Sequence, residues 1–96
     1  MFLVDMTFTN MNKITPELTQ QHKLYLEQEY KSNKLMFGGR KVPRTGGVLL
    51  SQHATEQVLI EMLEADPFVK SGAASYSITE FVPVMASLQY ASTLDK

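Results

Sequence analysis

The sequence contains no cysteine among its 96 residues. A disulfide framework, a thiolate zinc site and a cysteine nucleophile are therefore excluded, and the absence fits a reducing compartment. An excess of charge of one sign is also lacking, because nine basic residues face ten acidic ones and the net charge is −1. This balance favours neither nucleic acid nor an anionic membrane as a partner.

Long hydrophobic runs are absent too. No stretch approaches the roughly 20 apolar residues that a membrane-spanning helix needs. The first residues lack a basic segment and reach Asp5 after Met1 and three further apolar side chains, which is not the pattern of a signal peptide. We therefore expect a cytoplasmic protein. Its length suits one domain, and a domain this small often gains stability by association because it buries only about 60–65% of its unfolded surface.

Hydrophobic periodicity predicts four strands and two helices. Residues 2–9 alternate apolar and polar side chains, which is typical of a half-buried strand. Thr15, Pro16 and Glu17 supply an N-cap, a first helical residue and an acid for the first turn of a helix that runs to about residue 33. The other expected elements are strands at 35–37, 48–50 and 75–84, a helix at 55–65 and one further turn at 67–71.

The resulting order is β-α-β-β-α-β, the ferredoxin-like arrangement of an α+β sandwich. Both helices then cover the same face of the sheet. The other face carries a half-apolar set that we expect a second subunit to cover, so the sequence predicts a homodimer. The set expected on this open face is Thr7, Met36, Leu49, Thr79 and Phe81.

His22 is the most unusual residue of the first helix, because it lies in the apolar stripe with Leu18 and Leu26. Such a histidine is most often a satisfied core or boundary residue. Its reference pKa of about 6.5 also suits it to take and return a proton. Glu29 shares the stripe, where we expect it to reach water, and His53 is expected at the surface.

Asp66 has two interpretations. It precedes Pro67, as an N-cap of a short helical turn does. It also lies at the C-terminal end of the second helix, where a negative charge is disfavoured by up to ~1 kcal/mol. A nearby cation or imidazolium would explain that placement, and the two roles are compatible because they use different oxygens.

Four segments together resemble one known family. They are Lys41-Val42-Pro43-Arg44-Thr45-Gly46-Gly47-Val48-Leu49-Leu50, Ala65-Asp66-Pro67-Phe68-Val69-Lys70-Ser71-Gly72, the helical pattern Leu-x-x-x-His-x-x-Tyr-Leu around His22, and Ile78-Thr79-Glu80-Phe81. This combination resembles the YciI-like (YCII-related) family. The resemblance covers about residues 1–84, which we take as the domain, and leaves residues 85–96 as a C-terminal extension.

The resemblance implies a dimeric α+β barrel, in which two sheets face each other, and a His/Asp pair in a cleft. Carried over to this chain, the pair is His22 as acid and base and Asp66 as its partner. Some relatives eliminate hydrogen chloride from a chlorinated hydroquinone. Many relatives have Ser-Gly-Pro where this chain has Gly38-Gly39-Arg40, so one hydroxyl that could bind a ligand is lost here.

Two functions follow from these residues. The first is a cofactor-independent lyase or isomerase of a small organic molecule, in which His22 moves a proton and Asp66 orients the ring. The second is a non-catalytic dimeric module that binds a ligand or a partner in the same cleft.

The substrate-binding candidates lie outside that pair. Arg40 and Arg44 bracket a glycine-containing loop and could hold an anionic or phenolic ligand, since arginine binds such oxygens bidentately. Asp5 and Tyr25 are the other candidates. A metal site would require the two histidines and a carboxylate to converge, which the spacing does not indicate, so we expect no metal and no cofactor.

Overall fold

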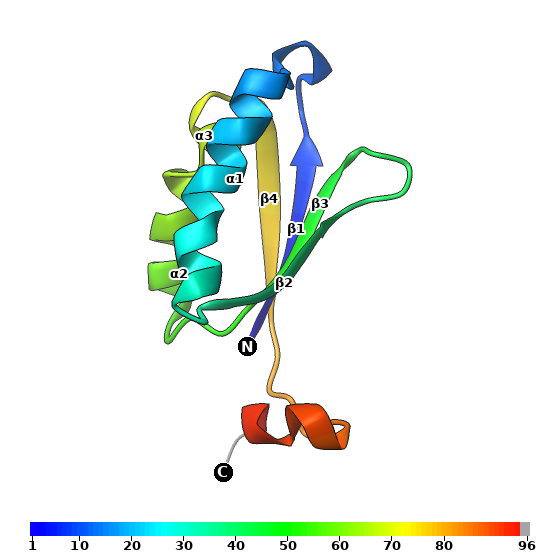
Figure 1. Cartoon of the computed structure of the whole chain (residues 1–96), viewed down its shortest axis with the longest axis vertical. Helices are drawn as coiled ribbons and strands as arrows, with labels where there is room; N and C mark the ends of the chain where they lie inside the picture. The colour runs from blue at the N-terminus through cyan, green and yellow to red at the C-terminus, as the bar shows by residue number, and fades with distance from the viewer. Residues whose placement is uncertain (95–96) are drawn as a thin grey trace.

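The computed structural model describes residues 1–94 and contains one four-stranded antiparallel sheet with helices on one face (Figure 1). The spatial order of the strands is β2-β3-β1-β4. In chain order, the elements are β1 (Phe2–Phe8), a 3₁₀ turn (Met11–Lys13), α1 (Pro16–Lys31), β2 (Leu35–Arg40), β3 (Gly46–Ser51), α2 (Glu56–Glu64), α3 (Pro67–Lys70), β4 (Ala74–Glu80) and a 3₁₀ helix (Leu88–Thr93). The predicted α+β class and ferredoxin-like order are confirmed.

The helices begin where the capping residues predict. The hydroxyl of Thr15 accepts the backbone N–H of Leu18 at 3.1 Å, and Pro16 is the first residue of α1. Thr55 caps α2 in the same way. Each cap satisfies a backbone donor that has no partner inside its helix. The turn expected after Asp66 is present as α3.

The core lies between the sheet and the three helices. The alternation predicted for β1 is confirmed, because Phe2, Val4 and Met6 are buried while the residues between them are exposed. The helices contribute Leu26, Leu59, Met62, Leu63 and Phe68 to the same cluster. This single core fixes α1 and α3 over the sheet, and these are the elements that carry the site.

A β-bulge in β2 changes which side chains face the helices. Leu35 pairs with Ser51, but Phe37 pairs with the preceding residue of β3, Leu50, so Met36 is an extra residue. One extra residue reverses the alternation of side chains beyond it. As a result Phe37 faces the open side of the sheet, whereas Gly38 faces α1.

The predicted membership of the open face was wrong at two positions. Leu49 pairs with buried Val4 and is itself only 6% exposed, so it faces the helices. Val48 and Leu50, on either side of it, occupy the open face in its place. Met36 lies at the bulge, and Phe37 occupies the position on the open face that was expected for Met36.

No helix covers the open face in the part of the chain that the structure describes (Figure 1). Leu3, Phe37, Val48 and Phe81 remain exposed there, Phe37 to 52%. After β4 the chain leaves the sheet and forms the 3₁₀ helix Leu88–Thr93, where the centroid of the Tyr90 ring lies 5.9 Å from that of Phe37. Within residues 1–94, no helix has the length and apolar character required to cross a membrane.

Candidate functional site

His22 and Asp66 are in direct contact. The His22 Nδ1 lies 2.9 Å from each carboxylate oxygen of Asp66. Asp66 is fully buried at the junction of α2 and α3, whereas 18% of the His22 side chain is exposed. An ionised carboxylate only accepts hydrogen bonds, so in the neutral imidazole Nδ1 carries the proton and Nε2 keeps its lone pair.

Asp66 also caps α3, so both interpretations of this residue hold at once. Its Oδ1 accepts the backbone N–H of Phe68 at 2.8 Å. Pro67 follows as the first helical residue. The buried carboxylate is therefore surrounded by donors from two elements, which compensates the cost of removing it from water.

The plane of the His22 ring is fixed by an aromatic neighbour. The Phe68 ring stacks on it with 4.1 Å between centroids and 18° between planes. Phe8 packs its edge against Phe68 at 5.5 Å, and the guanidinium of Arg44 lies 5.5 Å from the centre of the Phe8 ring. The pair and Arg44 thus belong to one continuous cluster.

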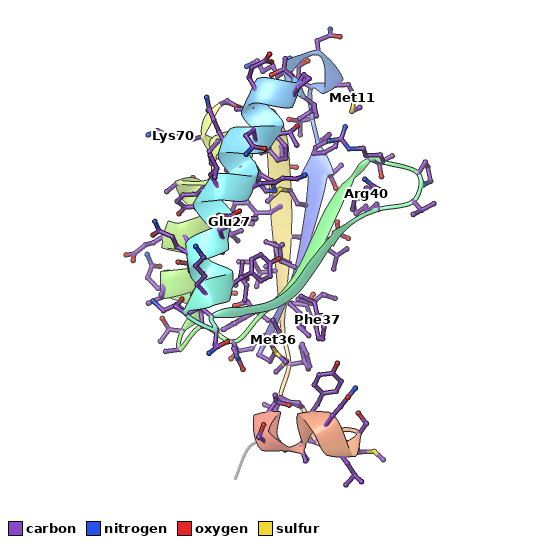
Figure 2. All side chains as sticks on the ribbon, viewed as in Figure 1. Met11, Glu27, Met36, Phe37, Arg40 and Lys70 are labelled. Carbon is purple, nitrogen blue, oxygen red and sulfur yellow. The ribbon has the colours of Figure 1, made fainter. Side chains whose placement is uncertain are left out.

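This cluster forms one end of an open cavity of about 570 Å³ between α1 and the β2–β3 hairpin. The cavity, which we call the groove, is within the range of ~300–1,000 Å³ usual for small-molecule sites. Glu27 on α1 and Arg40 on β2, both labelled in Figure 2, are among the residues that line the groove. Three cations, Lys23, Arg40 and Arg44, and one acid, Glu27, line it, so its charge favours an anion.

The structure brings Arg40 and Arg44 to the groove with His22, but it places Asp5 and Tyr25 elsewhere. The Asp5 carboxylate pairs with the ammonium of Lys41 at 2.5 Å on the open face. The Tyr25 hydroxyl donates to the backbone carbonyl of Met62 at 2.8 Å. Burial, together with the charges of Glu29 and Asp66, raises the pKa of Tyr25. Neither residue lines the groove.

Several residues that line the groove were not predicted from the sequence. Tyr30 is the most important, and a signal for it exists, because Tyr30 follows His22 and Leu26 at four-residue spacing on the same face of α1. Phe8 and Phe68 had no such signal, since their position depends on how β1 and α3 pack.

A second hydrogen-bond network joins Glu29, His53 and Ser51, and it corrects the prediction that His53 lies at the surface. His53 is only 5% exposed. Its Nδ1 accepts the Ser51 hydroxyl at 2.6 Å, and its Nε2 donates to Glu29 Oε1 at 2.7 Å. Ser51 is completely buried and so cannot meet a substrate. The network joins α1, the end of β3 and the entry to α2, and its role is structural.

Comparison with known sequences decides the family. The model of the YCII-related domain matches residues 3–82. The chain belongs to the YCII-related domain family. The resemblance drawn from the sequence is therefore confirmed. No curated protein matches the chain.

The fold of this family member is similar to that of a solved enzyme structure. That structure is 5-chloro-2-hydroxyhydroquinone dehydrochlorinase from Burkholderia phenoliruptrix AC1100, in complex with 2,5-dihydroxybenzoquinone. The sequences are 20% identical over 83% of this chain and 91% of the other, with a TM-score of 0.71. At this identity, the likeness shows the shared fold.

Proposed function

We propose that this protein is a small-molecule lyase or isomerase that moves a proton on an aromatic anion. The observation that carries the proposal is the His22–Asp66 contact, which holds an imidazole with a free Nε2 at one end of a cation-lined groove. The dehydrochlorinase activity and the quinone ligand named for the structural neighbour support a reaction of this class.

In the proposed elimination, a proton first moves from a ring hydroxyl to the carbon that carries the leaving group, which gives a non-aromatic keto tautomer. Nε2 of His22 then accepts the proton of a second hydroxyl. The electron pair of that O–H bond forms a carbonyl, the adjacent ring double bond shifts to the carbon that carries the leaving group, and the bond to the leaving group breaks. Asp66 is the positioning residue, because its carboxylate holds the ring and stabilises the imidazolium that forms. His22 then returns the proton to water. Acid–base help of this kind contributes ~10²–10⁴-fold.

The arginines supply the electrostatic part of the proposal. The guanidinium of Arg44 lies beside the aromatic cluster around His22, and Arg40 lines the same groove. A guanidinium binds a carboxylate or phenolate with two parallel hydrogen bonds. The arginines would therefore hold an anionic substrate and stabilise the negative charge that develops as the proton leaves.

The test is chloride release from chlorinated hydroquinones, beginning with 5-chloro-2-hydroxyhydroquinone. We expect turnover by the wild-type protein and a loss of at least about 100-fold in His22→Gln. Gln21→Ala, which changes an exposed neighbour on α1, is the matched control and should keep full activity. Equal turnover in His22→Gln and wild type would contradict the role of His22.

The cap hydrogen bond favours a second candidate function, a ligand-binding module, because it gives Asp66 a structural purpose without chemistry. Such a module would bind an aromatic anion and release it unchanged. It would also bind that ligand equally well in wild type and Asp66→Asn.

We also propose that two copies pair through the open face of the sheet. Its exposed apolar side chains include Leu3, Phe37 and Val48, and neighbouring apolar side chains exposed on one face are typical of an interaction surface. A charge at its centre should prevent pairing, so Val48→Lys should run as a monomer in light scattering. Leu24→Lys, on the outer face of α1 and 54% exposed in the wild type, is the control that should stay dimeric. A monomeric wild type would refute the pairing.

A further inference from the structure

The groove extends far beyond His22. His22, Leu26 and Tyr30 follow one another at four-residue spacing on α1, and all three line it. Eight residues of α-helix rise about 12 Å. The aromatic cluster with Arg44 therefore marks one end of the groove, and Tyr30 marks the other.

The position of Tyr30 depends on a glycine in the opposite wall. A Cβ added to Gly38 would lie 1.8 Å from the Tyr30 hydroxyl oxygen and 2.8 Å from a methyl carbon of Leu49. Any side chain at residue 38 would therefore displace the phenol. Gly38 faces α1 only because of the bulge at Met36. Because residue 38 is a glycine, the β2–β3 hairpin leaves the space beside its backbone that the Tyr30 hydroxyl occupies.

The Tyr30 hydroxyl is available to a ligand. Two other tyrosines use theirs inside the protein, since Tyr25 donates to a backbone carbonyl and Tyr76 donates to Glu64. Within residues 1–94, Tyr30 makes no such bond, although it lines the groove. Burial raises the pKa of Tyr30, so the phenol keeps its proton at neutral pH and can donate it to an acceptor.

The size of the groove exceeds that of a single ring. An apolar cavity of ~150 Å³ is enough to hold benzene, and the groove encloses about 570 Å³. A one-ring substrate held by Arg44 beside His22 would leave the Tyr30 end filled only by water.

We propose that the substrate of the His22 site is an elongated aromatic anion, bound at its anionic end by Arg44 and at its far end by a hydrogen bond from Tyr30. This inference rests on the proposed function and adds the class of substrate. The hydroxyl of Tyr30 selects molecules with an oxygen at the far end, and the apolar surfaces of Leu26 and Leu49 pack against the part between.

Three probes test the proposal: benzoate, biphenyl-4-carboxylate and 4′-hydroxybiphenyl-4-carboxylate. Their binding to the wild-type protein is measured by ¹⁵N NMR titration, which also reports on the amides of Gly38 and Gly39. We expect the second ring to tighten binding by about tenfold, and the distal hydroxyl by a further two- to tenfold. The amide of Gly38 should shift with the biphenyls and not with benzoate.

Two variants make the test specific. Tyr30→Phe should remove the gain from the distal hydroxyl while benzoate binds as before. Gly38→Ala should weaken both biphenyls, because its Cβ displaces Tyr30, again without effect on benzoate. Thermal melts of both variants establish that they fold. Arg44→Gln should weaken all three probes alike.

The outcomes separate this inference from the proposed function. If benzoate binds through Arg44 but neither the second ring nor the hydroxyl improves affinity, the elongated substrate is refuted and the acid–base proposal stands. If the hydroxyl improves binding equally in wild type and Tyr30→Phe, the role of Tyr30 is refuted. If none of the three probes binds, the elongated anion site is refuted, and the proposed function is decided separately by the chloride-release assay.

Discussion

Replacing Asp66 with asparagine should leave the fold intact but move the proton on the His22 ring. The side-chain oxygen of the introduced amide can still accept the backbone N–H of Phe68, which in the wild type bonds to Oδ1 at 2.8 Å. The amide nitrogen, however, only donates. This nitrogen takes the place of Oδ2, which lies 2.9 Å from Nδ1 of His22, so a protonated Nδ1 would face a donor. We therefore expect Nδ1 to accept, so that the proton moves to Nε2 and the lone pair of Nε2 is lost.

The expected magnitudes follow from these contacts. Asp and Asn are about equally good N-caps, so the cap contributes almost no loss. Exchanging a charge-assisted hydrogen bond for a neutral one costs about 1 kcal/mol, which lowers Tm by roughly 4–8 °C in a chain of this length. Turnover should fall much further, by ~10³–10⁴-fold, since the base of the proposed reaction would be in the wrong tautomer. Asp66→Ala, which also loses the cap, should cost about 2–4 kcal/mol.

Long-range ¹H–¹⁵N spectra of the imidazole rings measure the tautomer directly and need no substrate. His53, whose Nε2 donates to Glu29 at 2.7 Å, provides an internal reference that should not change. A His22 ring that keeps its proton on Nδ1 in Asp66→Asn would refute the reasoning. So would unchanged turnover in a variant whose tautomer has been shown to switch.

Three further predictions concern stability. His53→Ala should lower the free energy of unfolding by about 2–4 kcal/mol in denaturant titrations, since it leaves a cavity and removes the ring nitrogen that accepts the proton of the buried Ser51 hydroxyl, which keeps only the backbone N–H of residue 53; a loss below about 0.5 kcal/mol would contradict the structural role. Burial, with a hydrogen bond to a neighbouring carboxylate, raises the pKa of Tyr76 from 10.0 to about 12, so its contribution to stability should be complete below pH 10 and lost as pH rises toward 12. Melting curves across this range should fall less steeply in Tyr76→Phe, and an equal fall would refute the assignment. Gly46→Ala should unfold well below the wild-type Tm, because its Cβ would lie 1.9 Å from the Met6 carbonyl oxygen; an unchanged Tm would show that β3 can shift.

Local chemistry explains why much of the fold could be predicted. The order of elements follows from periodicity within single segments, and the starts of α1, α2 and α3 follow from Thr15, Thr55 and Asp66 with their neighbours. His22 could be named as a candidate site residue because it is a polar side chain within the apolar stripe of its helix. These signals are contained within a few consecutive residues, where propensity and capping act.

The features that escaped prediction depend on partners from other elements. The buried His53 ring is hydrogen-bonded to Glu29 of α1, 24 positions away along the chain, and no residue adjacent to His53 indicates that it is buried. The bulge at Met36 is defined by pairing with β3, since β2 read alone is a short apolar run followed by two glycines, with no sign of an extra residue. The contact of Tyr30 with Gly38 likewise joins a helix to a strand, and a glycine-rich segment by itself indicates only a turn or close backbone approach.

The bulge has a consequence for how members of such a family diverge. It separates the part of β2 that anchors the core, at Leu35, from the part that lines the groove. If Met36 instead joined the ladder in regular alternation from Leu35, Phe37 and Gly39 would turn toward α1 and Arg40 toward the open face. With the same sequence and the same order of elements, the β2 side of the groove would then carry the Phe37 ring in place of the Arg40 guanidinium. Specificity in this architecture can therefore evolve by changes of register, which a comparison of aligned side chains alone would miss.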